Sequence, residues 1–142
     1  IGLPDWGSEP WLISIGNNTE VSFDVAFITH DGATWCFRDQ DEYKGTLKFG
    51  RIRIGNNCFI GARSTILPGV TIGDNSIVAV GAVVNKSIPS GEVWGVPAHY
   101  IMKTKDYADK CKENTPIYDL ENYRKNFREE VNLICDRMEH SM

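Results

Sequence analysis

The chain has 142 residues, of which 42% are hydrophobic, and a formal net charge of −4. This length is enough for one core and an appendage, and the negative charge excludes a general attraction to nucleic acids or membrane surfaces. No apolar run approaches the roughly twenty residues that span a membrane, and no signal-peptide pattern opens the sequence, so we expect a cytoplasmic protein without an integral membrane segment.

The N-terminal part of the sequence indicates one partial coil of a repeat. Apolar residues recur at a spacing of six from Ile15 through Val21 to Phe27. Residues 1–11 precede them with sequence of the same character. Because no initiator methionine is present, a further coil upstream of residue 1 is also consistent with the pattern.

Residues 31–50 interrupt this pattern and contain no six-residue repeat. A loop of this length without its own repeat is uncommon inside a compact domain and usually serves a function. It carries Trp35, Phe37, Arg38 and Tyr43, a mixture of side chains that suits a polar, ring-shaped ligand. The alternative is a plain insertion that packs on the domain or on a neighbouring subunit.

The strongest signal lies in residues 54–89, where an apolar residue opens each six-residue unit. A helix repeats its buried face about every 3.6 residues and a strand about every two, so neither explains this period. Hexapeptide repeats are typical of a β-helix, in which each unit supplies one short strand and one corner, and three units close a turn. The apolar residues are Ile54, Ile60, Ile66, Ile72, Val78 and Val84.

The interior of such a three-sided coil is narrow, and the sequence fits it. Coils stack at the strand spacing of about 4.8 Å, so Ile54 should lie under Ile72, and Ile60 under Val78. The fifth residue of most units is small, and Cys58 occupies one of these inward positions. Corners need tight or left-handed backbone, which glycine, asparagine and aspartate tolerate. We expect corners at Asn56, Asn57, Asp74 and Asn75.

The composition changes after Met102, and residues 103–142 contain no six-residue repeat. Apolar residues spaced by three or four predict one amphipathic helix, with Asp119 as its N-cap. We expect this helix to pack on the β domain or on a sister subunit, because a solenoid needs its open end covered. The apolar face consists of Leu120, Tyr123, Phe127, Val131, Ile134 and Met138.

Of the three histidines, His30 is the best candidate for chemistry because it lies where the partial coil meets the long loop. His140 is near the end of the chain, and His99 follows the sequence GVPA. A neutral imidazole can take a proton from a hydroxyl at neutral pH. A partner must fix its tautomer, and Glu9 and Asp31 are both candidates. The alternative is a purely structural histidine.

The sequence does not favour a metal centre. Residues 54–89 contain no histidine, so the wall of the coil lacks the cluster of histidine ligands that a metal site would need. The cysteines form no CxxC motif, and we interpret all four as free thiols in a reducing compartment. They are Cys36, Cys58, Cys111 and Cys135.

Four motifs, in the order GSEPWLI, FITHDGATW, ILPGVTIG and VNKSIPSGEVWGVPA, resemble those of the hexapeptide-repeat acyltransferases. The similarity covers residues 1–102 and is greatest to O-acetyltransferases of bacterial capsule and lipopolysaccharide gene clusters; galactoside and maltose acetyltransferases are also similar. It implies a left-handed parallel β-helix over residues 1–102 with an inserted loop at 31–50, and a helical extension over 103–142. It also implies a homotrimer with an active site in each groove between subunits.

The same resemblance implies acetyl-CoA as co-substrate, lying along the coil in that groove. His30 matches the catalytic histidine of the family. Ala62 and Val80 match positions whose backbone holds the pantetheine arm, with Gly61 and Gly81 leaving room for it.

At the nucleotide end, Asn85 and Lys86 match a Thr-Lys pair of the family, and a lysine there suits a phosphate group. The alternative for Lys86 is a solvated corner residue. His99 and Met102 depart from the family, which often has basic residues at these two positions. We therefore expect the phosphate contacts to move to Lys103 or Lys105.

The implied reaction is direct acetyl transfer to a sugar hydroxyl of a bacterial surface polysaccharide or its precursor. His30 would deprotonate the hydroxyl, and a backbone amide or the indole of Trp35 would stabilise the oxyanion. Glu9, Trp35 and Arg38 are the residues expected at the acceptor site. The alternatives are another acceptor, such as an antibiotic, an amino sugar or serine, and a non-catalytic β-helix scaffold.

Overall fold

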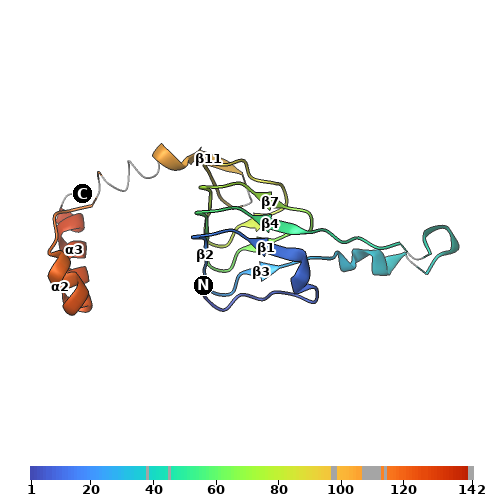
Figure 1. Cartoon of the computed structure of the whole chain (residues 1–142), viewed down its shortest axis with the longest axis horizontal. Helices are drawn as coiled ribbons and strands as arrows, with labels where there is room; N and C mark the ends of the chain where they lie inside the picture. The colour runs from blue at the N-terminus through green and yellow to red at the C-terminus, as the bar shows by residue number, and fades with distance from the viewer. Residues whose placement is uncertain (38, 45, 97–98, 107–112, 114, 141–142) are drawn as a thin grey trace. The chain divides into compact units, whose positions relative to one another are not determined.

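The computed structural model describes residues 1–37, 39–44, 46–96, 99–106, 113 and 115–140. The chain separates into two compact units, Ile1–Lys105 and Asp106–Met142. Figure 1 shows the whole chain. Arg38 and Cys111 lie outside the described residues.

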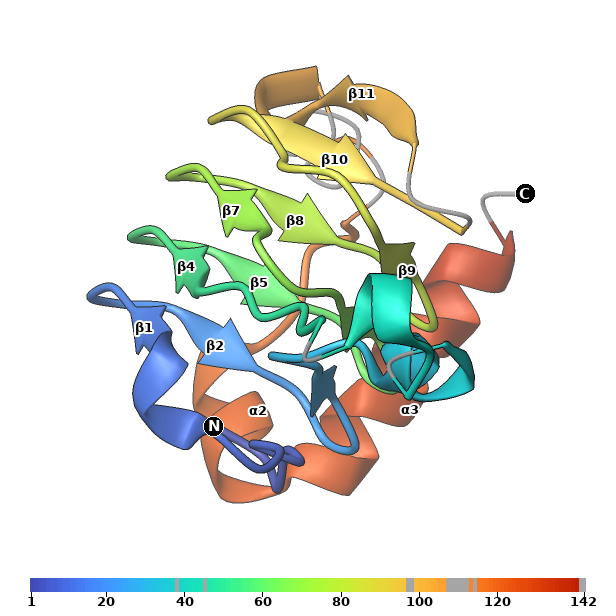
Figure 2. The ribbon, with the colours of Figure 1, turned by 90° about the vertical axis from the view of Figure 1, so that its right-hand side faces the viewer.

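Short parallel strands of the first unit wind through three sheets in turn (Figure 2). Each successive strand from β1 to β9 enters the next sheet, and every third strand returns to the same sheet, so the chain coils around three sides. The first sheet contains β1 (Ile13–Ile15), β4 (Ile52–Ile54) and β7 (Thr71–Ile72). The second contains β2 (Glu20–Val21), β5 (Phe59–Ile60), β8 (Ile77–Val78), β10 (Glu92–Trp94) and β11 (Tyr100–Lys103). The third contains β3 (Ala26–Phe27), β6 (Thr65–Ile66) and β9 (Val83–Val84).

All strand pairs between successive coils are parallel, whereas β11 returns antiparallel to β10. The register matches the repeat, because Ile54 pairs with Ile72 and Ile60 pairs with Val78. The prediction of a mainly β fold built on parallel strands is therefore confirmed.

The core of the first unit consists of the first and fifth residues of the six-residue units. The first residues, from Ile54 to Val84, are all buried. Burying one such side chain stabilises the fold by about 1.5–3 kcal/mol, so the stack of coils supplies most of the apolar stabilisation. The buried fifth residues are Cys58, Ser64, Val70, Ser76, Ala82 and Ile88.

The coil has three corners, which we name by the sheets that they join. The first corner joins the first and second sheets and comprises residues 16–19, 55–58, 73–76 and 89–91. The second corner joins the second and third sheets and comprises residues 22–25, 61–64 and 79–82. The third corner joins the third and first sheets and comprises residues 28–51, 67–70 and 85–87.

An asparagine ladder closes the first corner. The side-chain amide of Asn18 donates to Oδ1 of Asn57 at 2.8 Å, and that of Asn57 donates to Oδ1 of Asn75 at 2.8 Å. These three residues have φ angles of 53°, 55° and 58°, in the left-handed region that asparagine tolerates better than most residues. The corner residues expected from the sequence therefore lie where the chain turns.

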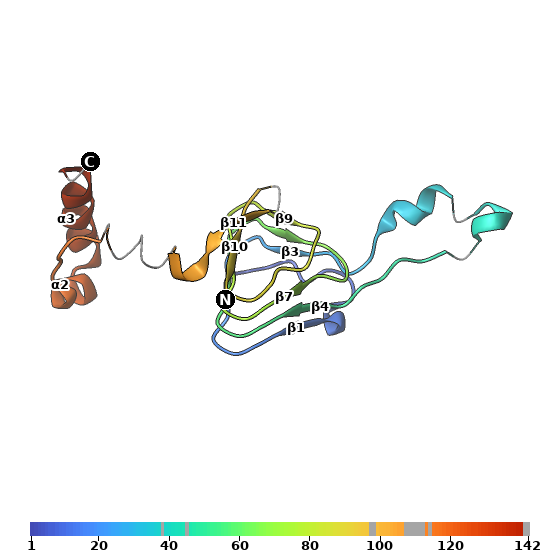
Figure 3. The ribbon, with the colours of Figure 1, turned by 90° about the horizontal axis from the view of Figure 1, so that it is seen from above.

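The third corner carries the 31–50 insertion, which contains two short 3₁₀ helices, η2 (Gly32–Cys36) and η3 (Asp41–Tyr43). Figure 3 shows it leaving the three-sided coil at this corner. Its two ends pair in antiparallel fashion, since His30 bridges Phe49 and the amide of Gly50 donates to the carbonyl of Thr29 at 2.9 Å.

Between residues 115 and 140, the structure describes two helices of the second unit, α2 (Leu120–Lys125) and α3 (Phe127–His140). The prediction of one helix through this region is wrong, because Asn126 leaves helical geometry with φ −128° and ψ 61°. Asp119 caps α2 as predicted, and its side chain accepts a hydrogen bond from the amide of Asn122.

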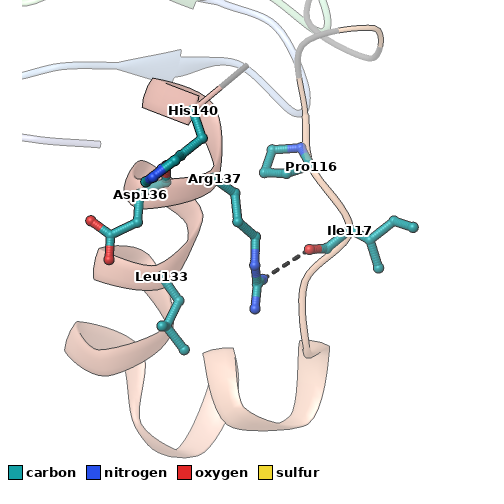
Figure 4. A pocket seen from close by; sticks show the side chains of 6 residues that line it. All are labelled: Pro116, Ile117, Leu133, Asp136, Arg137 and His140. Atoms are coloured by element: carbon teal, nitrogen blue, oxygen red, sulfur yellow. Dashed lines mark hydrogen bonds between the residues drawn. The ribbon is translucent and has the colours of Figure 1, made fainter. Parts of the chain in front are cut away.

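A buried carboxylate joins the two helices. Glu130 on α3 is 1% exposed and accepts hydrogen bonds from the amide of Asp119 and the side chain of Asn122, both at 2.9 Å. Beside α3 lies an open pocket, where Arg137 donates to the carbonyl of Ile117 at 2.9 Å (Figure 4). The lining residues are Pro116, Ile117, Leu133, Asp136, Arg137 and His140. Within the described part of the chain, no helix has the length and apolar character needed to cross a bilayer.

Candidate active site

His30 and Glu9 form a contact at the third corner. Nδ1 of His30 lies 2.9 Å from Oε2 of Glu9, although 21 residues separate the two in the sequence. The same carboxylate oxygen accepts a hydrogen bond from the hydroxyl of Thr29 at 2.5 Å. The side chain of His30 is 44% exposed, whereas that of Glu9 is 16% exposed, so the imidazole is partly open to solvent and its partner is largely covered.

The N-terminal segment brings Glu9 to this position by packing on β3. Asp5 bridges Ala26, and Trp6 stacks on Phe27 with ring centroids 5.1 Å apart. Gly7 has a φ of +70°, and a Cβ at this residue would lie 2.7 Å from the carbonyl oxygen of Phe27. Only glycine therefore allows the close approach that places Glu9 beside His30.

The hydrogen bonds at Glu9 define the tautomer of His30. The Thr29 hydroxyl, followed by His30, lowers the pKa of the Glu9 carboxyl from its ordinary value of 4.5. An ionised carboxylate only accepts hydrogen bonds, so the hydrogen of the neutral imidazole belongs on Nδ1. Nε2 then carries the free lone pair, which is the arrangement that a general base requires.

Asp31, the other candidate partner of His30, has a different role. Its side chain accepts a hydrogen bond from the amide of Ala33 at 2.9 Å and caps η2. That amide is the main cause that lowers the pKa of the Asp31 carboxyl. Lys48 lies 3.6 Å from the other oxygen of the same carboxylate. The structure therefore places Glu9, and not Asp31, on the ring nitrogen of His30.

A depression of about 350 Å³ opens in front of His30. Two aromatic residues line it, Trp35, which is 69% exposed, and Phe49, whose ring centroid lies 5.8 Å from that of His30. Carboxylate and ammonium groups of Asp31 and Lys48 line the same depression. Of the residues predicted for the acceptor, Glu9 and Trp35 lie here, and Arg38 lies outside the described residues.

The residues predicted to hold acetyl-CoA are distributed over different corners of the coil. Asn85 and Lys86 lie at the third corner, the corner of His30. Ala62 and Val80 stack at the second corner, where the carbonyl of Ala62 accepts from the amide of Gly81 at 2.9 Å and Val80 is 66% exposed. One chain therefore does not bring the two groups together.

Lys103 lies away from both groups. It pairs with Glu92 at the end of β10 and β11 nearest the first corner, with 3.7 Å between its ammonium nitrogen and the Glu92 carboxylate. At the opposite end of these strands, the carbonyl of His99 accepts from the amide of Gly95 at 3.0 Å. His99 thus lies at the end of these strands nearer the second corner.

Sequence reasoning missed Thr29, Lys48 and Phe49 as residues of this site. Thr29 precedes the insertion and Phe49 lies near its end, and only the pairing of the two ends brings them together. The sequence signal was the THD motif itself, in which the residue before the histidine is a hydrogen-bonding one. Among the described residues, no group of three or more histidine, cysteine, aspartate or glutamate side chains could hold a metal ion.

Comparison with known proteins agrees with this architecture. Residues 51–86 match the hexapeptide repeat of succinyl-transferase. Protein CapG of Staphylococcus aureus is 46% identical over 119 residues, which cover 83% of this chain and 68% of CapG. The chain belongs to the hexapeptide-repeat acyltransferase family. CapG is a relative over most of its own length, so the assignment does not depend on the repeat alone.

Solved structures of the family have the same fold. A galactoside acetyltransferase in complex with coenzyme A is 32% identical with a TM-score of 0.56, over 68% of this chain and 48% of that protein. A maltose O-acetyltransferase from Clostridium difficile 630 is 27% identical with a TM-score of 0.54, over 72% of this chain and 63% of that protein. The chain thus spans about half of the first protein and less than two thirds of the second.

Proposed function

We propose that this chain is an acetyl-CoA-dependent O-acetyltransferase whose acceptor is a sugar hydroxyl of a bacterial surface polysaccharide or its precursor. The observation that carries the proposal is the Glu9–His30 pair, in which Glu9 binds Nδ1 of a half-exposed imidazole that lines a depression. The aromatic residues Trp35 and Phe49 that line this depression suit a sugar ring. The two solved relatives, a galactoside and a maltose acetyltransferase by name, support a sugar as acceptor.

In the proposed reaction, Nε2 of His30 takes the proton of the acceptor hydroxyl while Glu9 holds Nδ1. The hydroxyl oxygen forms a bond to the acetyl carbonyl carbon, and the carbon–sulfur bond of the thioester breaks. The imidazolium then returns the proton to the departing sulfur. A backbone amide or the indole N–H of Trp35 is the proposed donor to the negative oxygen that develops on the carbonyl.

The finer architecture that we propose is a left-handed parallel β-helix that assembles as a homotrimer. A groove between two copies would combine the third corner of one chain, with His30, Asn85 and Lys86, and the second corner of its neighbour, with Ala62 and Val80. This pairing explains why a single chain separates the two groups. We propose that acetyl-CoA lies in this groove and that the protein acts in the cytoplasm.

Within this groove, Lys86 is the proposed phosphate contact because it shares the corner of His30. Lys103 is a weaker candidate than the sequence suggested, since its ammonium group already lies beside Glu92 near the first corner. His99 is a better placed candidate for the end of the groove at the second corner.

The proposal is tested by incubating the purified chain with acetyl-CoA and a panel of acceptors, and by following release of the coenzyme A thiol. The panel comprises neutral sugars, nucleotide sugars, oligosaccharides, amino sugars and serine. We expect turnover with a sugar that has only hydroxyl groups, giving a base-labile ester in the product. Turnover confined to amines, or no binding of acetyl-CoA by calorimetry, would overturn the proposal.

A further inference from the structure

Thr29 is a buried hydroxyl that connects three segments of the site. Its side chain is 2% exposed and donates to Oε2 of Glu9 at 2.5 Å. Its carbonyl accepts from the amide of Gly50, the residue at which the insertion returns to the coil, at 2.9 Å. The hydrogen bonds of this one residue therefore tie together the N-terminal segment, the His30 corner and the end of the insertion.

The direction of the Thr29 hydrogen bond is fixed by its partner. A carboxylate has no hydrogen to give, so the hydroxyl hydrogen points at Glu9. The same oxygen faces Nδ1 of His30 at 2.9 Å, and it therefore receives one hydrogen from each side. Burying a hydroxyl is costly unless it forms a hydrogen bond, so removing Glu9 as acceptor would leave Thr29 in an unfavourable position.

We infer that Thr29 is a positioning residue, whose hydroxyl holds the Glu9 carboxylate in the orientation that keeps the hydrogen of His30 on Nδ1. This inference rests on the proposed function, because it assigns Thr29 a role in making Nε2 the base. It differs from a packing role, since valine has nearly the same shape as threonine but cannot donate.

The hydrogen bond also affects the charge of Glu9. The Thr29 hydroxyl is the largest cause that lowers the pKa of the Glu9 carboxyl. Without it, Glu9 takes up a proton at a higher pH, and a protonated Glu9 has no negative charge and accepts from Nδ1 more weakly. Among the described residues, the other charged groups that line the depression are Asp31 and Lys48 from the insertion, and none of the variants changes them.

The test compares T29V with T29S, and uses T19V as a matched control. Thr19 is also a threonine of the coil, but its hydroxyl donates to the carbonyl of Gly55 at the first corner, at 2.8 Å. Two quantities are measured in the full chain. One is kcat/KM against pH, and the other is the titration of the Glu9 carboxyl carbon by ¹³C NMR without acetyl-CoA, assigned with E9Q.

We expect T29V to lower kcat by about tenfold, the order expected for losing a hydrogen bond to a charged group. The acid limb of its pH profile and the Glu9 titration should both move to higher pH, while KM for acetyl-CoA stays the same. T29S should restore kcat, the pH profile and the Glu9 titration to their wild-type values. T19V should change none of these three. In the E9A background, T29V should add no further loss, because the hydrogen bond between Thr29 and residue 9 is already absent.

An unchanged pH profile and an unchanged Glu9 titration in T29V would overturn the inference, as would a full additional loss in the E9A background. If T29V does not fold, T29A gives the same readouts. If the wild-type chain transfers no acetyl group to any acceptor, the proposed function fails, and the catalytic role of Thr29 fails with it. The NMR titration needs no activity, so it still decides separately whether Thr29 controls Glu9.

Discussion

The first and third corners of the coil show how one repeat can serve two purposes. Both corners join strands of the same coils, but the first is closed by hydrogen bonds from Asn18 through Asn57 to Asn75. The third corner opens into a long insertion and carries His30. The comparison teaches that regularly stacked corners stabilise the coil, and that the candidate catalytic residue lies where an insertion interrupts the stack.

The third corner returns to the stack by a close backbone contact. A Cβ on Gly50 would lie 2.3 Å from the amide nitrogen of Gly69 in the next coil, so only glycine fits where the insertion ends. The insertion is thereby anchored at both ends, with His30 at one end and Gly50 at the other.

The largest expected effect is on the rate when the third corner loses its imidazole. We expect H30A to reduce kcat by about 10²–10⁴-fold, the usual contribution of a general base. Its melting temperature and its affinity for acetyl-CoA should stay near those of the wild type, because His30 is half exposed. The control is H140A in the second unit, which should retain full activity. Survival of acetyl transfer in H30A would remove His30 from its proposed role.

A substitution in the core of the coil should lower the stability of the whole coil, in contrast to H30A, which should lower the rate. Ile60 is fully buried between coils, so I60A should lower the free energy of unfolding by about 2–5 kcal/mol. The matched control is R53A, at an exposed position on β4, which should change stability by less than about 0.5 kcal/mol. Denaturant unfolding followed by circular dichroism measures both. Equal effects of the two changes would contradict the assignment of the inward face.

Breaking the asparagine ladder should affect stability and leave the rate unchanged. N57A removes two side-chain hydrogen bonds and places alanine at a φ of 55°, which should cost about 1–2 kcal/mol. N57G loses the same hydrogen bonds but relieves the backbone, so it should fall between N57A and the wild type. Thermal unfolding and the thiol-release assay measure the two properties. A loss of activity without loss of stability would show that the first corner also takes part in chemistry.

The smallest expected effect is the pH dependence of stability at Glu9. Its folded pKa is lower than the ordinary 4.5, so its contribution is fully present above pH 4.5 and is lost as the pH falls through the folded pKa. The difference in unfolding free energy between wild type and E9Q should therefore shrink as the pH drops below 4.5. Urea titrations across this range measure it. A difference that grows toward acid pH would contradict the hydrogen-bonded carboxylate.

The coil could be predicted from the sequence because its period is local. The spacing of six from Ile54 to Val84 fixes which residues point inward, and Asn57 and Asn75 mark corners by residue type alone. The prediction of a single C-terminal helix failed because Asn126 interrupts an apolar spacing that continues on both sides. Spacing reports which face is apolar, but it does not report where the backbone stops being helical.

The site was only partly predictable, because its contacts join distant segments. His30 stood out through its position at the insertion, yet the spacing alone could not decide between Glu9 and Asp31 as its partner. That choice depends on how Gly7 lets the N-terminal segment pack on β3, which is a tertiary contact. For the same reason, Lys103 was chosen by its place in the sequence, and its pairing with Glu92 became visible only in the folded chain.

The most direct test of the account is complementation between two inactive variants. H30A removes the base at the third corner, and V80W fills the exposed second corner. If each site combines these corners from neighbouring chains, mixed trimers purified through a different tag on each variant should recover about one third of the wild-type activity. If both corners of one chain form the site, mixed trimers should remain as inactive as each variant alone, and that result would contradict the account.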